Sequence, residues 1–500
     1  MWTENMPGWL ENQQRNPTTP ATLTVLLLLS FLTLAIGSTL LTAFTCPVRS
    51  LPGPWYTAFT HLVLKYHIIA GRRIYYVDAL HARYGPIVRI TPSEASIADP
   101  AAAQAIHKPG SGFTKSAWYE MLVTAGRPEL AARIGVFALR DPARHAVRRK
   151  LFARPFSLSS LRENMEGVVR ERGELAVRRI REEAAGSGAG GVADALKWWT
   201  LMATDVIAQF CFGENFASLD VGKQTPFIDA LQRMLICNLL LGEFPLLNWV
   251  GPYLPIRSIQ RLFEADRIVF DHGSIAIKNM RSASGNMRSL FGQALVQADS
   301  AEQSQLTDDT VRHEAANLIL AGADTTALTL TYLLWSVLKR PDLRAALEEE
   351  VAGLSGGLTH EELVDARLLN SIIDETLRLY TPAPSGLQRD VPAGGQTLCG
   401  MYIPAGVVVS TQAYTLHRDP KVFEDPLDQR QKASLMPFGA GTRLCLGIHL
   451  SMMELRIATA LFFRKCRGAR LAADMTDEKM VMVEHFLVAP KGHCCHIVLS

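Results

Sequence analysis

The first strong pattern of apolar positions is a long run without any charged residue, over residues 21–44. A helix rises about 1.5 Å per residue, so this run extends about 36 Å and exceeds a hydrocarbon core of about 30 Å. Arg15 is the only basic residue before the run, whereas Arg49 and Lys65 are the first of several that follow it. This asymmetry places the C-terminal part in the cytosol. We expect a retained anchor; the alternative, a cleaved signal peptide, would have an apolar region of only about 7–15 residues.

The apolar run divides the chain into parts that differ in environment. The segment Cys46–Trp55 includes three prolines and a glycine, which cannot continue a helix, so it predicts a stiff hinge. The expected parts are a lumenal N-terminus (1–20), a transmembrane helix (21–44), a proline-rich hinge (45–60) and a globular catalytic domain (61–500).

From His61 onward the pattern is that of a globular, mainly α-helical protein with a small β region. Alternation at Ile87–Ile90 predicts a strand that pairs with residues 95–97. Apolar residues at helical spacing fill residues 195–256, with breaks at Pro245 and Pro252. Further expected elements are helices over 74–84, 141–152, 171–185, 306–340 and 448–463, and strand-like structure over 382–410.

Composition narrows the class of protein. Hydrophobic residues make up 48% of the 500 residues and charged residues 20%, which describes a globular chain with a large core. A net charge of +3 gives no argument for nucleic-acid binding. The eight cysteines form no C-x-x-C pair, which favours buried free thiols over disulfides or a zinc site. Residues 186–191 match G-x-G-x-x-G, but they follow a charged helix and not a strand, so we reject a dinucleotide site.

The helix expected over residues 306–340 has an unusual middle. Thr307 can cap its start, and Pro341 can open the next helix. Within the helix, Gly322 costs about 1 kcal/mol relative to Ala, and burying the carboxylate of Asp324 costs more. A sequence that accepts both indicates a functional site. The alternative is a kinked core helix whose Thr hydroxyls bond back to the backbone.

A second unusual segment, Pro437–Gly447, joins glycines, an aromatic ring, a cation and a thiol. Phe438 offers a flat apolar surface, and Arg443 offers a rigid fork for a carboxylate. Cys445 precedes a helix whose first N–H groups would stabilise a thiolate. Gly439, Gly441 and Gly447 would permit backbone angles or close approaches that a Cβ forbids. The set predicts a loop that holds a large flat cofactor through one sulfur; a buried structural cysteine in a glycine-rich turn is the alternative.

Glu375 and Arg378 lie one helical turn apart among apolar neighbours. Such pairs are common on exposed helices, so the spacing alone is weak evidence. The apolar residues on either side predict that this pair is buried.

Together these segments resemble the cytochrome P-450 family of haem-thiolate monooxygenases. The loop gives F-x-x-G-x-R-x-C-x-G in full, residues 321–326 give A-G-x-D-T-T, and residues 375–378 give E-x-x-R, in the family's order. The resemblance covers roughly residues 51–500. It implies the mainly helical fold of that family and a haem b (iron protoporphyrin IX) cofactor.

The resemblance also assigns roles to single residues. Cys445 would be the axial metal ligand, within the loop that includes Phe438, Gly439 and Arg443. Gly322 would leave room for dioxygen, while Thr325 would hydrogen-bond the activated oxygen and Asp324 would relay protons. The haem propionates would be bound by Arg149, Arg389 and His145, the last standing where the family commonly has Trp. Residues 383–387 and 484–488 would face an apolar substrate, and the pair Glu375–Arg378 would hold the fold around the haem.

Electrons must come from another protein, because we find no flavin or nicotinamide domain. The resemblance implies an NADPH-dependent flavoprotein reductase on the same membrane, the endoplasmic reticulum, so NADPH would act only indirectly. Its docking face could be the basic run of Arg144, Arg148, Arg149, Lys150 and Arg154, for which a solvated surface is the alternative. The motifs resemble those of fungal enzymes of secondary-metabolite biosynthesis.

One departure from the family leaves a second function open. Members usually carry F-x-P-E-R-[FW] before the cysteine loop, and its Arg completes a triad with the E-x-x-R pair. Residues 421–436 lack this motif, and Arg430 is the single candidate replacement. A chain unable to hold haem would be a non-catalytic ligand-binding membrane protein. A haem-thiolate isomerase or dehydratase is a third reading, against which the presence of Asp324 and Thr325 argues.

Overall fold

A computed structural model describes residues 20–186, 191–257, 289–294, 307–423 and 434–499, together with Gln260 and Gln431. The α-helices are α1 (Pro20–Thr45), α2 (Leu62–Ile69), α3 (Arg73–Tyr84), α4 (Pro100–His107), α5 (Trp118–Thr124), α6 (Pro142–Ala153), α7 (Leu158–Asn164), α8 (Glu166–Ala185), α9 (Ala195–Phe212), α10 (Ser218–Val221), α11 (Pro226–Glu243), α12 (Leu246–Val250), α15 (Asp308–Leu338), α16 (Pro341–Gly353), α17 (His360–Asp365), α18 (Arg367–Leu379), α19 (Ala413–Leu416), α20 (Pro420–Phe423) and α22 (Ile448–Lys465). Short 3-10 helices are η1 (Trp55–Ala58), η2 (Pro128–Arg133), η3 (Gly251–Tyr253) and η5 (Gly441–Arg443).

The strands are short and form small sheets. They are β1 (Ile87–Thr91), β2 (Glu94–Ile97), β3 (Thr114–Lys115), β4 (Val192–Asp194), β5 (Gly386–Asp390), β6 (Gln396–Leu398), β7 (Met401–Ile403), β8 (Val408–Gln412), β9 (Arg470–Leu471), β10 (Met482–His485), β11 (Leu487–Pro490) and β12 (His496–Val498). The main sheet has the order β1-β2-β8-β5-β3, with β2 and β8 parallel and the other pairs antiparallel. The mainly helical fold with a small β region is confirmed.

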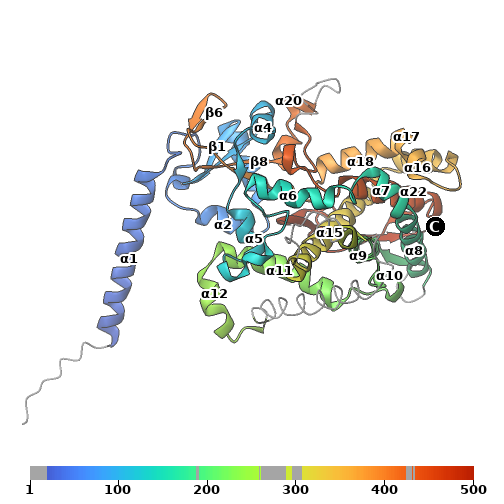
Figure 1. Cartoon of the computed structure of the whole chain (residues 1–500), viewed down its shortest axis with the longest axis horizontal. Helices are drawn as coiled ribbons and strands as arrows, with labels where there is room; N and C mark the ends of the chain where they lie inside the picture. The colour runs from blue at the N-terminus through green and yellow to red at the C-terminus, as the bar shows by residue number, and fades with distance from the viewer. Residues whose placement is uncertain are drawn as a thin grey trace, which may run out of the picture.

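The main sheet and most of the helices occupy different parts of the molecule. The main sheet, with α2, α3 and α4, lies at the end from which α1 extends, and the other helices form the larger part (Figure 1). The long helix α15 runs through the helical part, where it packs against α9, α22 and α18. Its buried residues, among them Ala315, Ile319, Ala323 and Leu330, belong to the largest apolar cluster. This helix is therefore the axis of the core.

Several sequence-based expectations about elements are confirmed. The Thr307 hydroxyl accepts a hydrogen bond from the N–H of Thr310, so it caps α15. Pro341 begins α16, and β1 pairs with β2 as expected. The glycine-rich segment follows helix α8, which supports rejecting a dinucleotide site; residues 187–190 of that segment lie outside the described residues.

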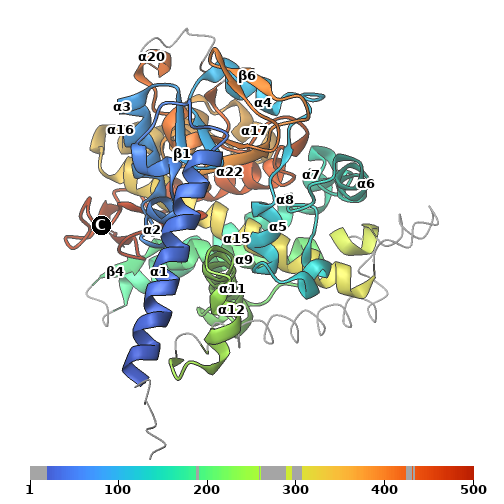
Figure 2. The ribbon, with the colours of Figure 1, turned by 90° about the vertical axis from the view of Figure 1, so that its left-hand side faces the viewer.

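Two described helices are long and apolar enough to cross a membrane. Residues Leu23–Thr45 of α1 form one, and none of its most apolar window is buried. In the other, Thr310–Leu338 of α15, 67% of the window is buried, so α15 is a core helix. Figure 1 shows α1 extending away from the globular part, and Figure 2 shows it from the side on which it stands. Residues 1–19, most of the expected lumenal segment, lie outside the described residues.

The proline-rich segment after α1 is bonded to the sheet through one arginine. The buried guanidinium of Arg89 on β1 donates hydrogen bonds to the carbonyl oxygens of Arg49 (2.7 Å), Leu51 (3.1 Å) and Pro54 (3.1 Å). Hydrogen bonds from a charged donor stabilise by about 1.5–3 kcal/mol each. These bonds hold the connection between α1 and the globular part in one conformation.

Candidate functional site

The cysteine loop folds back on itself just before α22. The N–H of Cys445 donates to the carbonyl of Phe438 at 2.8 Å, and the N–H of Leu444 donates to the carbonyl of Gly441 at 3.1 Å. Phe438 is half-buried and packs against the main apolar cluster. These short-range bonds present the Cys445 side chain on a closed loop at the start of a long buried helix.

Two of the three loop glycines are required by the backbone, and one is not. Gly439 has a φ of 74° and Gly441 a φ of 63°, and a Cβ on Gly441 would lie 1.8 Å from the carbonyl oxygen of His107. Gly447 has an ordinary φ of −86°, and a Cβ there would meet only Phe156 at 3.7 Å. The expectation of a special backbone role for Gly447 was therefore wrong, because its position as the N-cap of α22 requires neither a positive φ nor a close approach.

The environment of the Cys445 thiol acts in both directions on its pKa. Cys445 has accessible surface, yet the surrounding protein desolvates its thiol, and this desolvation raises the pKa of the thiol. The N–H of Gly447 and the guanidinium of Arg149 lower it. The N–H groups at the helix start stabilise the thiolate as expected, but their effect on the pKa is smaller than that of desolvation. A bound metal cation would outweigh desolvation, because a thiol that coordinates a metal is deprotonated.

Basic side chains converge next to this loop. Arg443 donates to the carbonyls of Leu139 (2.6 Å) and Arg140 (2.9 Å), and Arg149 on α6 donates to the carbonyl of Leu444 at 2.8 Å. Burial, followed by the charge of nearby Arg389, lowers the pKa of Arg443 to about 10.

His145, also on α6, is buried within this group. Burial and then the charges of Arg443, Lys115 and Arg149 lower the pKa of His145 to about 4. Its imidazole is therefore neutral near pH 7 and has one N–H to donate. This fits a donor to a carboxylate in the position where the family commonly has Trp.

Arg389 and a residue that the sequence analysis missed complete the group. Lys115 on β3 is the cross-strand partner of Arg389 on β5, and both are buried. Burial, followed by the charges of Arg389 and Arg443, lowers the pKa of Lys115 well below its ordinary value. No local pattern marks Lys115, because only the β3–β5 pairing brings it here. We call Lys115, Arg149, Arg389 and Arg443, together with the neutral donor His145, the cation cluster.

The donor chemistry of the cation cluster fits a ligand with carboxylates. In the described part of the chain, none of its members forms an ion pair with an Asp or Glu, and their hydrogen bonds go to backbone carbonyls or to Tyr119. Because like charges repel one another strongly at low dielectric, an anionic ligand would stabilise this group of cations. A flat macrocycle with two propionates, bound beside Cys445, matches both the sulfur and the cations, so the residues present fit haem.

The A-G-x-D-T-T segment lies in the middle of α15, where its side chains are held by neighbours. The Thr325 hydroxyl donates to the carbonyl of Ala321 at 2.7 Å, within its own helix. The Asp324 carboxylate accepts a hydrogen bond from Nε2 of Gln232 on α11 at 2.8 Å. Burial raises the pKa of Asp324 to about 6, and this hydrogen bond opposes the rise. Asp324 can therefore gain and lose a proton near neutral pH.

Close packing between α15 and α9 explains why residue 322 is a glycine, which is a different reason from the one expected. A Cβ on Gly322 would lie 2.8 Å from Cγ1 of Ile207 on α9, and real Cβ contacts of this length are essentially absent. The expectation that this glycine also leaves room for dioxygen stays a prediction. The side-chain direction at this position points toward α9, and Gly322 allows the two helices to pack closely.

Glu375 and Arg378 on α18 form a bidentate ion pair, with both N–O distances 2.7 Å. Its Glu375 side chain is 52% exposed among the described residues, so the expected burial of the whole pair was wrong. Arg378 also donates to the carbonyl of His417 at 2.6 Å. Arg430, the candidate third member of the triad, lies outside the described residues.

His417 connects this pair to the cysteine loop, which the sequence analysis did not anticipate. Its Nδ1–H donates to the carbonyl of Arg378 (3.1 Å), and its Nε2 accepts the N–H of Met436 (2.9 Å), directly before Pro437. Both bonds require the neutral ring, and burial lowers the pKa of His417 to about 4. α18 is thereby linked to the segment that carries Cys445.

Aromatic side chains gather at the turn between β10 and β11. Phe486, at the β10–β11 turn, has a φ of 79°, and its ring lies 5.7 Å from those of Trp118 and Phe137. The N–H of Val488 donates to the carbonyl of Pro382 at 2.9 Å, so the two stretches expected to face substrate are neighbours. A non-glycine residue at positive φ is strained and is commonly found at functional sites.

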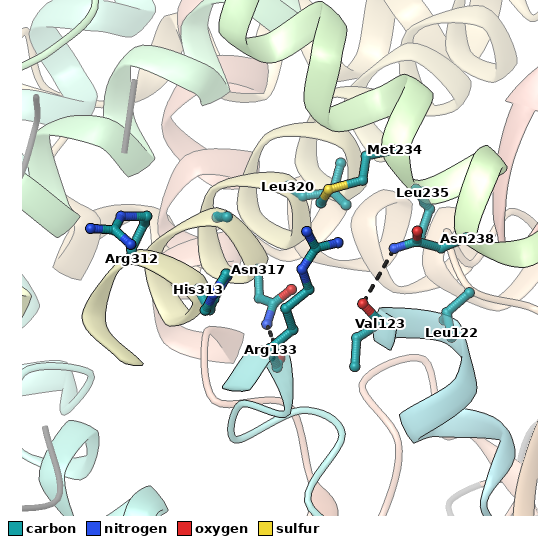
Figure 3. Close-up of a pocket in the computed structure, with 11 residues that line it drawn as sticks. Leu122, Val123, Arg133, Met234, Leu235, Asn238, Arg312, His313, Asn317 and Leu320 are labelled. Carbon is teal, nitrogen blue, oxygen red and sulfur yellow. Dashed lines mark hydrogen bonds between the residues drawn. The ribbon is translucent and has the colours of Figure 1, made fainter. Parts of the chain in front are cut away.

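A pocket lies between α5, α11 and α15. Figure 3 shows Leu122 and Val123 of α5, Met234 and Leu235 of α11, and Asn317 and Leu320 of α15 around it, with the Arg133 side chain among them. Leu320 precedes Asp324 by about one helical turn, so the pocket lies toward the N-terminal end of the A-G-x-D-T-T segment.

The basic run on α6 separates into distinct roles. Arg148 is largely buried and pairs with the fully buried Glu314 of α15 at 3.0 Å, so a solvated surface is the wrong description for it. Glu314 also accepts the N–H of Val136. Arg144, Lys150 and Arg154 are exposed.

Comparison with known proteins gives the same assignment as the geometry. Residues 51–493 match the family model for cytochrome P450. Cytochrome P450 monooxygenase aflV of Aspergillus parasiticus is 43% identical over 92% of this chain and 92% of its own length. Cytochrome P450 monooxygenase stcB of Emericella nidulans is 40% identical over 92% of this chain and 90% of its own, and cypX of Dothistroma septosporum 38% identical over 94% of each. The chain belongs to the cytochrome P450 family of haem-containing monooxygenases.

Proposed function

We propose that this chain is a membrane-anchored monooxygenase that uses dioxygen and reductase-supplied electrons to hydroxylate or otherwise oxidise an apolar small molecule. The observation that carries the proposal is the meeting of Cys445 with the cation cluster, which suits one thiolate-bound haem b. The relatives are monooxygenases by name and match over nearly the whole chain. Their fungal origin supports a place in secondary-metabolite biosynthesis.

In this proposal each named residue has one task. Cys445 ligates the iron; Phe438 and Gly439 shape the loop; the cation cluster binds the propionates. Haem iron bound through a thiolate activates dioxygen, because the sulfur pushes electron density that favours O–O cleavage. The pair Glu375–Arg378 holds the surrounding fold.

Proton handling falls to the middle of α15. Asp324, whose pKa is about 6, can accept a proton from water and release it into the site. The Thr325 hydroxyl would turn from the carbonyl of Ala321 to donate toward the reacting oxygen. The apolar wall with Phe486 would exclude water from the substrate.

The proposed electron donor is a separate NADPH-dependent flavoprotein reductase. Arg144, Lys150 and Arg154 present exposed positive charge on α6, the helix whose Arg149 contacts the cysteine loop. An acidic reductase surface would be attracted to this face. NADPH would therefore serve the enzyme only through its partner.

The proposed location is the endoplasmic reticulum membrane, with one span and the catalytic domain in the cytosol. Besides α1, the side chains of Trp249 and Tyr253 are 79% and 85% exposed. Figures 1 and 2 both place α12, which carries Trp249, on the side toward which α1 extends. Aromatic residues favour membrane interfaces, so this face suits contact with the bilayer.

The absorption spectrum of the reduced, carbon-monoxide-bound protein tests the proposal. We expect a strongly red-shifted Soret band that Cys445→Ser abolishes, while Cys466→Ser, on a buried cysteine of the same region, retains it. A preparation that binds no haem would refute the catalytic assignment. Product formation with a reductase, and its loss when NADPH is omitted, tests the electron route.

A further inference from the structure

Gln232 is the one side chain that the described structure shows hydrogen-bonded to Asp324. It comes from α11, far from α15 in sequence, and its Nε2 lies 2.8 Å from a carboxylate oxygen of Asp324. Gln232 is half-buried, so this contact forms within the protein and not on its surface. Such a contact fixes the carboxylate's direction.

An amide suits a carboxyl group whose protonation changes. Its N–H donates to a carboxylate, and after a half-turn of the amide its oxygen accepts the O–H of a carboxylic acid. A Lys or Arg could only donate and would favour the ionised form. A Gln can therefore hold the same side chain before and after each proton transfer.

The charged groups named below, on the helices around Asp324, either bond to other groups or reach the surface. On α9, the Asp205 carboxylate accepts the N–H groups of Ser218 and Leu219. On α15, Glu314 is paired with Arg148. On α11, Asp229 is partly exposed and Arg233 exposed. In the described part of the chain, burial and Gln232 are the influences on the pKa of Asp324.

We propose that Gln232 is a positioning residue that holds Asp324 through both protonation states during proton delivery. The inference rests on the proposed role of Asp324. It adds α11, which also lines the pocket of Figure 3 through Met234 and Leu235, to the proton-handling machinery. In this proposal Gln232 acts only through Asp324.

The C–O stretching band of the reduced, carbon-monoxide-bound full-length holoenzyme tests this inference without a known substrate. Followed from about pH 5 to about pH 8, the band should shift with a midpoint at the pKa of Asp324, about 6. Asp324→Asn should remove the step. Gln232→Leu removes the N–H that favours the carboxylate, so its midpoint should rise by at least about half a pH unit.

Gln232→Glu and Arg233→Leu complete the set. Gln232→Glu keeps the shape but adds a like charge and should raise the midpoint further, which guards against misfolding of the leucine variant. Arg233→Leu, an exposed neighbour on α11, should leave the midpoint in place. With reductase and NADPH, both Gln232 variants should release more hydrogen peroxide per NADPH than the wild type.

Unchanged midpoints in both Gln232 variants, with an intact Soret band, would overturn the inference while leaving the proposed function standing. Absence of the carbon-monoxide complex in the wild type would instead refute the proposed function. The two failures are therefore distinguishable.

Discussion

The cysteine loop and the middle of α15 are held in place by different kinds of contact. The loop is bonded to distant parts of the chain: Arg443 donates to Leu139 and Arg140, and Arg149 donates to Leu444. The middle of α15 packs against α9, and its Thr325 hydroxyl bonds within its own helix, to the carbonyl of Ala321. Within the described residues, Gln232 alone joins the carboxylate of Asp324 to another helix by a side-chain hydrogen bond.

The difference separates cofactor retention from chemistry. Residues of the loop and of the cation cluster support a tertiary arrangement, so replacing them should alter folding or haem binding. Side chains on a rigid, packed helix can be changed without moving the backbone that carries them. Replacements in the middle of α15 should therefore alter turnover while haem stays bound.

The largest effect should come from Arg378→Ala. This change leaves the His417 carbonyl and Glu375 without their charged donor and weakens the link from α18 to the cysteine loop. We expect little or no haem-containing protein on expression, measured by the haem-to-protein ratio. Arg367→Ala, at an exposed position of the same helix, is the control. An Arg378→Ala protein with full haem content would contradict the role given to the ion pair.

A smaller but still large loss is expected from Arg148→Met, which leaves Glu314 buried and unpaired. Breaking a buried ion pair costs about 3–5 kcal/mol, and the pair here is almost fully buried. Denaturant unfolding should show this loss of stability. The double variant with Glu314→Gln should recover part of it, because no buried charge remains. Equal stability of single and double variants would argue against a buried charge at Glu314.

Lys115→Met tests one member of the cation cluster. Removing this buried cation should reduce repulsion between like charges in the haem-free protein and weaken the binding of a propionate. We expect haem to be lost several-fold faster to a haem-scavenging protein, with apoprotein stability unchanged or higher. Lys150→Met, an exposed residue of α6, should leave the rate of haem loss unchanged. An unchanged rate in Lys115→Met would remove Lys115 from the propionate site.

The smallest structural effect should come from Thr325→Val. Its hydroxyl makes the same local bond as that of Thr329, 2.7 Å and 2.8 Å to the carbonyl one turn earlier. Thr325→Val and Thr329→Val should therefore lose similar, small amounts of stability. Only Thr325→Val should divert electrons from product to hydrogen peroxide, by about tenfold or more if the hydroxyl assists proton transfer. Equal diversion in both variants would contradict a special role for Thr325.

Local sequence chemistry predicted the elements and the individual reactive groups. The apolar run before Cys46, the cap at Thr307 and the pairing of β1 with β2 depend on neighbours in sequence, and each is found in the structure. The F-x-x-G-x-R-x-C-x-G segment likewise indicated its cofactor, because thiol, ring, cation and glycine lie within one short loop.

Tertiary structure alone decided which residues act together. Lys115 joins the cation cluster through β3–β5 pairing, His417 reaches the cysteine loop through two ring nitrogens, and Gln232 meets Asp324 across two helices. No sequence spacing identifies these three contacts, because the number of residues between two partners does not tell how close they lie in the folded protein. The burial that sets the pKa of Asp324 is equally a property of the packed fold, because desolvation depends on every element around a group and not on its neighbours in sequence.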